Sequence, residues 1–320
     1  MLMRRSRRGI VFFLLFVVLI ALACYLPTAP VQDSPAVVDS TKIALEIQAT
    51  TMALQLTQAA LNSQPAVQPT VPPPPQPTAA PVEVPAQIQP TPTTDMEALI
   101  HSANVLVYEN TDEYGIGMWV QDTLDMMGLK YTQTGSYSGH FMEYLNSGKK
   151  YDLIIVDAEA KDIISGEFWD VINTRLARDK AGLIAEIWYL DTESNGPISK
   201  ILGGCGVHYR KDYSLADSIY WWNPTHPVFN EPNTVLPLLH YNRYWANQTG
   251  DEIRLGGSGD ATMLAGLSAK SSDEGVLASC YDGRVIIQTF SDHDYNQEDI
   301  IPLWENYIHY TLKNHFLALQ

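Results

Sequence analysis

The sequence has little cysteine and little positive charge. Its 320 residues include only three cysteines, and 20 Lys and Arg stand against 36 Asp and Glu, which gives a formal net charge of -16. No cysteine pair or histidine-rich spacing has the form of a structural zinc site. Beyond the N-terminal arginines the largest basic cluster is Lys149-Lys150, and an acidic surface disfavours polyphosphate backbones. We therefore expect no nucleic-acid partner and, without a cofactor motif, no cofactor.

A long apolar run occurs at the N-terminus, from Gly9 to Leu26, directly after Arg4, Arg5, Arg7 and Arg8. Its 18 residues span about 27 Å as a helix, close to the roughly 30 Å hydrocarbon core of a bilayer. Arginines before such a run keep the N-terminus in the cytoplasm. We therefore interpret residues 1–27 as a signal or membrane anchor and expect the rest of the chain at the extracytoplasmic face of the cell membrane.

The end of this run, Ile20-Ala21-Leu22-Ala23-Cys24, resembles a bacterial lipoprotein signal, in which a small residue precedes a cysteine that is lipidated. The resemblance implies cleavage before Cys24 and lipidation of its side chain. The alternatives are an uncleaved signal anchor with a chance cysteine, and ordinary cleavage with release of the chain. Lipidation and an uncleaved anchor would both tether the protein to the membrane.

Three segments of different composition follow the anchor. Residues 28–64 have heptad spacing of apolar residues from Ile43 to Leu61 and favour a partly helical stalk. Residues 65–95 are rich in proline, including Pro72 to Pro75, and lack aromatic residues, which is typical of an extended, disordered spacer. All seven tryptophans lie in residues 96–320, which we interpret as one globular head domain.

In the head domain, short apolar segments alternate with amphipathic ones. Strands are predicted over 104–108, around Tyr131, and over 151–156 and 182–189, and helices over 116–127, 141–145 and 166–180. Toward the C-terminus, 276–281 and 284–290 flank Asp282-Gly283, a pair that suits a type I′ hairpin turn, and a helix is predicted over 301–319. We expect a three-layer α/β fold around a mostly parallel sheet with a C-terminal hairpin.

Four segments give the head a resemblance to a known family. They are Val105-Leu106-Val107, residues 225–229 (Thr-His-Pro-Val-Phe), residues 282–287 (Asp-Gly-Arg-Val-Ile-Ile) and residues 304–308 (Trp-Glu-Asn-Tyr-Ile). In their order and spacing, residues 104–315 resemble the class I glutamine amidotransferase-like superfamily, in particular its divergent trehalose-utilisation-type members and related flavodoxin-like domains. The resemblance implies a flavodoxin-like fold but does not specify an activity, because one fold hosts many functions.

Class I amidotransferases carry their cysteine nucleophile in a Gly-x-Cys-x-Gly turn between a strand and a helix. The corresponding place follows strand 182–189, where Glu186 to Asp191 (Glu-Ile-Trp-Tyr-Leu-Asp) contain no nucleophile. Cys205 follows a predicted helix instead, and we interpret Gly203 to Val207 as a glycine helix stop, with a catalytic Cys205 as the alternative. In an oxidising compartment Cys205 and Cys280 can form one disulfide, or they remain two buried thiols.

Charged residues gather where the predicted parallel strands end, which is the usual position of ligand crevices in such sheets. The resemblance makes His293 the candidate counterpart of the amidotransferase histidine, with Tyr295 where a partner carboxylate is implied. The candidate pocket residues are Glu109, Asp112, Asp157, Glu159, Glu186, Asp292, His293 and Asp294.

Converging carboxylates and one imidazole allow three kinds of chemistry. They could bind a divalent cation through oxygen ligands, hold a sugar with Trp119, Trp221 or Trp222 as stacking faces, or supply an acid and a base for hydrolysis. The alternative is that they are solvated residues of ordinary turns. The sequence leaves the presence of a metal ion open.

A strand and helix framework without a nucleophile favours a binding module over an enzyme. We expect a membrane-tethered extracytoplasmic domain that binds carbohydrate or another cell-surface component. The alternative is an extracytoplasmic hydrolase that uses the strand-end carboxylates and His293, with or without a metal ion. A third hypothesis is a structural head that docks on a membrane complex. The sequence indicates no oligomeric state.

Overall fold

The computed structural model describes residues 95–320, apart from 113, 161–165, 214–217, 243 and 246–249. These residues belong to the unit Gln87–Gln320. The predicted anchor at 1–27 with Cys24, the stalk at 28–64 and the spacer up to residue 94 lie outside the described residues, so these predictions stay untested. Across the described ranges, no helix has both the length and the hydropathy that a membrane crossing requires.

An eight-stranded sheet forms the centre of the head, in the order β2-β1-β3-β4-β11-β10-β8-β6. The first five strands in this order are parallel to one another: β2 (Lys130–Gln133), β1 (Asn104–Glu109), β3 (Leu153–Asp157), β4 (Gly182–Glu186) and β11 (Val285–Gln288). The other three pair antiparallel: β10 (Leu277–Cys280), β8 (Thr262–Gly266) and β6 (Tyr220–Trp221). The predicted mostly parallel sheet with a C-terminal hairpin is confirmed.

The parallel strands are short apolar runs that are buried on both faces. Every residue of β3 and of β4 is buried. Because side chains alternate along a strand, Leu106 and Ile154 belong to one hydrophobic cluster, whereas Val105 and Leu153 belong to a second one on the opposite face. Such strands need helices on both sides of the sheet.

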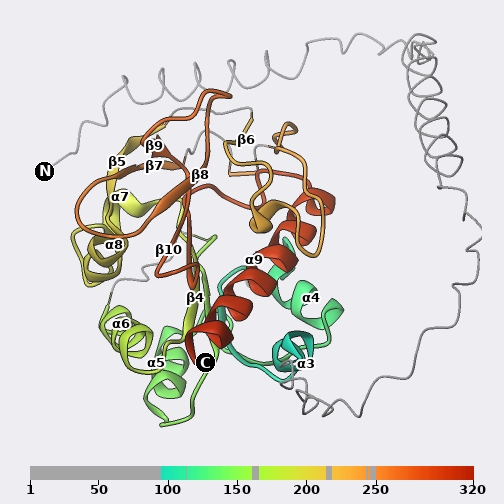
Figure 1. The fold of residues 1–320 in the computed structure, drawn as a ribbon, viewed down its shortest axis with the longest axis vertical. Coiled ribbons are helices and arrows are strands. Elements are labelled where there is room, and N and C mark those ends of the chain that lie inside the picture. The colour runs from blue at the N-terminus through green and yellow to red at the C-terminus, as the bar shows by residue number, and fades with distance from the viewer. Residues whose placement is uncertain (1–94, 113, 161–165, 214–217, 243, 246–249) are drawn as a thin grey trace, which may run out of the picture. The chain divides into compact units, whose positions relative to one another are not determined.

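Helices cover both faces, so the head has the three layers that were predicted. Figure 1 shows α3, α4 and α9 on one side of β4, and α5, α6 and α8 on the other. The first group is α3 (Met96–His101), α4 (Trp119–Met126) and α9 (Gln297–Ala318), and the second is α5 (Ser138–Asn146), α6 (Phe168–Arg178) and α8 (Ser199–Cys205). The short α7 (Leu190–Glu193) follows β4, and a 3-10 turn, η1 (Pro227–Phe229), packs on α9.

Several predicted boundaries differ from the structure, as three examples show. The helix predicted from residue 116 begins at Trp119, because Gly115 and Gly117 have φ values of 66° and 110° that a helix excludes. The strand predicted to residue 189 ends at Glu186, and the chain then turns into α7. The last helix begins at Gln297, four residues earlier than predicted.

The hairpin of β10 and β11 turns one residue earlier than predicted. Tyr281 and Asp282 have φ values of 53° and 55°, and Gly283 N–H donates to the Cys280 carbonyl at 3.1 Å, so these two residues are the centre of a type I′ turn. Asp260 stabilises this conformation, because its carboxylate accepts the N–H groups of Tyr281 and Asp282 at 2.8 and 2.6 Å.

A small antiparallel sheet that was not predicted lies beside α8. It contains β5 (Val207–Asp212), β7 (Asp251–Leu255) and β9 (Glu274–Gly275), in that order. Gly206, with a φ of 78°, ends α8 in the left-handed region, which confirms the predicted glycine stop. A disulfide joins Cys205 to Cys280 and so connects the end of α8 to β10.

Candidate functional site

Three carboxyl groups stand side by side at the C-terminal edge of the parallel sheet. Glu109 ends β1, Asp157 ends β3 and Glu186 ends β4, and Asp157 is the register partner of both others. Gln288, the last residue of β11, continues the row beside Glu186. These four residues each lie two positions after an apolar residue that faces α4 and α9. Because side chains alternate along a strand, all four side chains lie on that same face of the sheet. Neighbouring strands are about 4.8 Å apart, which brings the carboxyl groups into contact range.

Glu109 holds the N-terminus of α4. Its Oε1 accepts the N–H of Val120 at 2.9 Å, and its Oε2 accepts the backbone and side-chain N–H groups of Gln121 at 3.2 and 3.1 Å. The N-cap residue Met118 makes no side-chain cap of its own. Burial raises the pKa of Glu109 to about 8, although these hydrogen bonds act in the opposite direction. Glu109 therefore positions the helix that carries Trp119.

Asp157 and Glu186 form a buried carboxyl pair. Both are almost fully buried, and no described residue donates a hydrogen bond to either oxygen of an ionised Glu186. Burial, followed by nearby carboxyl groups, raises the pKa of both residues well above the ordinary values. A protonated Glu186 can donate to Asp157, and this hydrogen bond favours the proton on Glu186. The pair therefore keeps its protons to a higher pH than ordinary carboxyl groups do.

Glu159 fixes the chain after β11. Its carboxylate accepts hydrogen bonds from the Ser291 hydroxyl, from Trp245 Nε1 at 2.6 Å, and from the N–H groups of Asp292 and His293 at 3.1 and 3.3 Å. Burial alone would raise the pKa of Glu159, but the facing His293, Ser291 and Trp245 side chains outweigh it and the pKa is lowered. Glu159 is therefore the ionised member of the cluster.

Asp292 and Asp294 are also held by internal hydrogen bonds. Asp292 accepts the indole N–H of Trp304 and the side-chain amide of Gln288, and burial raises its pKa well above the ordinary value. Asp294 accepts the Tyr241 hydroxyl at 2.9 Å and the N–H of Trp245 at 3.1 Å. Asp294 thus orders the segment that brings Tyr244 and Trp245 over the strand ends.

His293 connects this cluster to the surface. Its ring stacks on Trp119 with ring centres 3.9 Å apart and an angle of 23° between the planes. Nδ1 lies 3.4 Å from Glu159 Oε1, and neither ring nitrogen has a hydrogen-bond partner among the described residues. The side chain is only 3 % exposed.

A surface pocket of about 670 Å³ opens above His293. Aromatic rings of Trp119, His293 and Tyr244 line it together with polar groups of Asn242, Asn296, Gln297 and Glu298. Tyr244 is 45 % exposed, whereas Trp119 is mostly buried. The pocket therefore combines an accessible aromatic ring with amide and carboxylate groups, above carboxyl groups that solvent does not reach.

Six of the eight predicted residues come together below this pocket, namely Glu109, Asp157, Glu159, Glu186, Asp292 and His293. Asp294 lies beside them and orders the loop, as described above. Asp112 does not join them: it is exposed and lines a separate hollow with Gly135 and Tyr137. The chain forms a turn here, in which Tyr114 N–H donates to the Thr111 carbonyl at 3.1 Å and the Thr111 hydroxyl donates to the Gly117 carbonyl at 2.7 Å.

Two of the three predicted stacking tryptophans have structural contacts elsewhere. Trp221 is buried against Phe229 with ring centres 4.3 Å apart, and Trp222 donates to the Ser268 carbonyl at 2.7 Å. Both lie on β6 or directly after it, at the far edge of the sheet from β1. Of the three, only Trp119 lines the pocket.

A nucleophile is missing from the turn after β4. Trp188 and Tyr189 are buried there, and the indole of Trp188 donates to the Glu159 carbonyl at 2.7 Å. Cys205 is bonded to Cys280 and so has no free thiol. The alternative of a catalytic Cys205 is therefore wrong for this oxidised form.

No family model matches this sequence. A search of curated proteins finds no match either.

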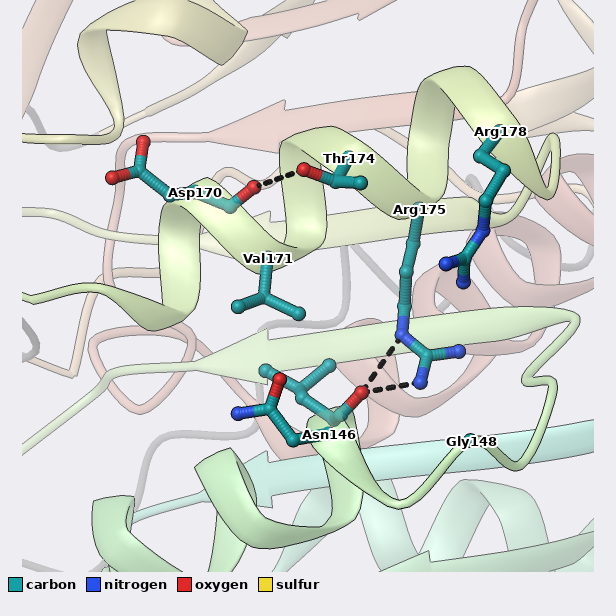
Figure 2. Close-up of a pocket in the computed structure, with 8 residues that line it drawn as sticks. Asn146, Gly148, Asp170, Val171, Thr174, Arg175 and Arg178 are labelled. Carbon is teal, nitrogen blue, oxygen red and sulfur yellow. Dashed lines mark hydrogen bonds between the residues drawn. The ribbon is translucent and has the colours of Figure 1, made fainter.

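A second hollow of about 330 Å³ lies between α5 and α6, away from the strand ends. Figure 2 shows Arg175 reaching from α6 toward the end of α5. Its Nε and Nη2 donate to the Leu145 carbonyl, its Nη1 donates to the Lys149 carbonyl at 2.8 Å, and Asp179 lies 3.6 Å away. The guanidinium thus caps the C-terminus of α5. We assign this hollow a structural role, because its buried cation is committed to backbone carbonyls.

A second group of carboxylates, Asp191, Asp212 and Asp251, lies beside the small sheet. Asp251 is buried, and its Oδ2 accepts the N–H of Asp191 at 2.9 Å. Burial, opposed by this hydrogen bond and assisted by the two neighbouring carboxylates, raises the pKa of Asp251 from 3.8 to about 8. The folded protein therefore holds the Asp251 proton more tightly than the unfolded chain does. The resulting contribution to the free energy of unfolding is fully present below about pH 4 and is lost as the pH rises toward 8.

Asp251→Asn is expected to reduce the pH dependence of stability. The amide cannot ionise, yet its oxygen can still accept the Asp191 N–H. The free energy of unfolding, measured in urea at pH 5, 6.5 and 8, should fall less with pH in the variant, which should be the more stable protein at pH 8. Exposed Glu143→Gln is the matched control, and parallel profiles for Asp251→Asn and wild type would show that the expected shift is wrong.

Proposed function

We propose that this protein is a membrane-tethered extracytoplasmic binding module whose head binds carbohydrate in the pocket of Trp119, Tyr244 and His293. The apolar run after the N-terminal arginines supports the tether. The disulfide between Cys205 and Cys280 supports an oxidising compartment, because such bonds persist outside the cytosol.

We further propose that the head descends from the amidotransferase-like, flavodoxin-like fold and has lost the nucleophile. The order β2-β1-β3-β4-β11 of the parallel strands supports this, because it corresponds to the 2-1-3-4-5 order of flavodoxin-like sheets. The buried Trp188 and Tyr189 after β4 support the loss, since their side chains occupy the turn where such enzymes carry their cysteine.

The pocket lining is the observation on which the choice of carbohydrate rests. Sugars present apolar C–H faces and a rim of hydroxyl groups, so their binding sites combine an aromatic face with amides and carboxylates. Tyr244 supplies an accessible ring, and Asn242, Gln297 and Glu298 supply donors and acceptors around it. The carboxyl groups below are buried, so they support the pocket floor without contacting the sugar.

Tyr244→Ala is expected to weaken glycan binding about tenfold, because it removes the accessible stacking face. Full-length protein in detergent would be screened on an array of bacterial surface glycans and peptidoglycan fragments, and the affinity for the best oligosaccharide measured by calorimetry. Tyr137→Ala is the control, since Tyr137 is 60 % exposed but lines a different hollow. Equal affinities for Tyr244→Ala and wild type would remove the pocket as the binding site.

One observation favours a hydrolase as the second candidate. His293 Nδ1 faces the ionised Glu159 at 3.4 Å, and its unpartnered Nε2 belongs to a side chain that lines the pocket. A carboxylate that orients an imidazole is the arrangement of a general base. Release of reducing sugar from the bound glycan that disappears in His293→Ala would establish this second candidate and exclude a purely binding role.

A further inference from the structure

The cluster below the pocket has an excess of buried acidic groups. Glu109, Asp157, Glu159, Glu186 and Asp292 are each at most 2 % exposed. Among the described residues, His293 is the only basic side chain within ion-pair distance of any of them. Buried carboxylates are costly unless protons, positive side chains or a cation compensate them.

Three of these carboxyl groups have oxygen atoms that could share one ion. An oxygen atom of each of Asp157, Glu159 and Glu186 lies within 4.8 Å of the others. Proximity alone does not define a cation site, because acidic groups often cluster at the ends of strands.

A second observation points to a cation: buried side chains in and beside this cluster lack hydrogen-bond partners. Neither oxygen of Glu186 accepts a hydrogen bond from a described residue, and neither nitrogen of the 3 % exposed His293 ring has a partner in the described structure. The imidazole Nδ1 faces Glu159 directly. Both oxygens of Glu186 therefore lie buried in the carboxyl cluster without a hydrogen-bond donor.

We propose that Asp157, Glu159 and Glu186 bind one divalent cation, with the His293 ring beside the site, where its Nδ1 faces Glu159 at 3.4 Å. Three carboxylates suit a divalent cation that prefers oxygen ligands, such as Mn²⁺. The ion would compensate the buried charge and hold the ends of β3 and β4 to the loop after β11. This inference does not depend on carbohydrate binding, since its ligands lie beneath the pocket.

The second carboxylate group, Asp191, Asp212 and Asp251, lacks these features. Asp251 accepts a backbone N–H, Asp212 accepts the Tyr209 hydroxyl at 2.6 Å, and the two outer carboxylates are exposed. It therefore serves as the internal comparison for a test of the proposed site.

The test is a Mn²⁺ titration of the full-length protein in detergent, after dialysis against EDTA, followed by electron paramagnetic resonance of free Mn²⁺. We expect one ion per chain and, at about 100-fold excess over the Kd, a rise in Tm of about 5–10 °C. A wild-type protein that binds no Mn²⁺ and whose Tm is unchanged by the ion would overturn the proposal, because protons alone would then neutralise the cluster.

Glu186→Gln and Asp157→Asn locate the ion. Each substitution keeps the size of the side chain and removes one ligand charge, so each should lower the Mn²⁺ affinity at least tenfold. Asp212→Asn, in the comparison group, should bind Mn²⁺ like wild type. Unchanged affinity in both ligand variants, or a loss of binding in Asp212→Asn, would contradict the proposed site. Circular dichroism of each variant verifies its fold, and the two ligand variants provide independent tests if one of them fails to fold.

Discussion

Glu159→Ala is expected to lower the free energy of unfolding by roughly 3–5 kcal/mol, as the removal of one partner from a buried charged network usually does. The substitution leaves the Ser291 hydroxyl, the Trp245 indole and the N–H groups of Asp292 and His293 without their acceptor. Each unsatisfied buried donor adds to the cost. Denaturant unfolding of the full-length protein, followed by tryptophan fluorescence, measures the change.

Glu143→Ala is the control for this experiment, because Glu143 is exposed on α5 and should change the stability by at most about 0.5 kcal/mol. Glu159→Gln should have an intermediate effect, since it retains one oxygen acceptor but loses the charge. A loss below about 1 kcal/mol for Glu159→Ala would mean that the loop after β11 is held by other contacts.

Removal of the disulfide, by Cys205→Ala together with Cys280→Ala, is expected to lower the free energy of unfolding by about 4 kcal/mol. The two cysteines are separated by 75 positions, and the bond restricts a loop of that length in the unfolded chain. It also connects α8 to β10 across one face of the sheet. Urea unfolding of the double variant and of wild type provides the measurement.

Dithiothreitol supplies the control for the disulfide. Wild type should lose a similar stability in the reducing agent, whereas the double variant should not respond to it. The double variant should also retain the glycan affinity of wild type while it stays folded, because Cys205 lies outside the pocket. A double variant as stable as wild type would contradict a structural role for the bond.

The distribution of polar groups explains why we favour binding over hydrolysis. Glu109, Asp157, Glu186 and Asp292 are buried, have raised pKa values and, except for Glu186, are already engaged in hydrogen bonds. A general acid or base has to reach the substrate, and none of these four residues lines the pocket, whereas His293 does. The carboxylates therefore shape and support the site.

The parallel core and the row of carboxyl groups could be predicted because they follow from local patterns. Runs such as Leu153 to Val156 are apolar at every position, which requires burial on both faces. Glu109, Asp157 and Glu186 each end such a run, and parallel strands bring their C-terminal ends to one edge. Their convergence follows from strand pairing without knowledge of any loop.

The pocket rim could not be predicted in the same way. Tyr244 belongs to a segment without a periodic pattern, and the Trp245 indole reaches Glu159 across 86 positions of sequence. Asp112 also follows β1, yet it is exposed and lines a separate hollow. The small sheet was missed because only the first residue of β5 is buried and β9 has only two residues, so neither shows an alternation of buried and exposed positions. These features depend on long-range contacts that composition and spacing do not encode.

The most direct test of the proposed function is a nuclear magnetic resonance titration of the indole N–H signals with the oligosaccharide that binds best. We expect shifts of the Trp119 and Trp245 signals, which report on the pocket and the loop beside it, and an unchanged signal of Trp169 on the opposite face of the sheet. We also expect the glycan to be recovered intact. Shifts confined to Trp169, or the appearance of cleaved glycan during the titration, would contradict a binding module at the strand ends.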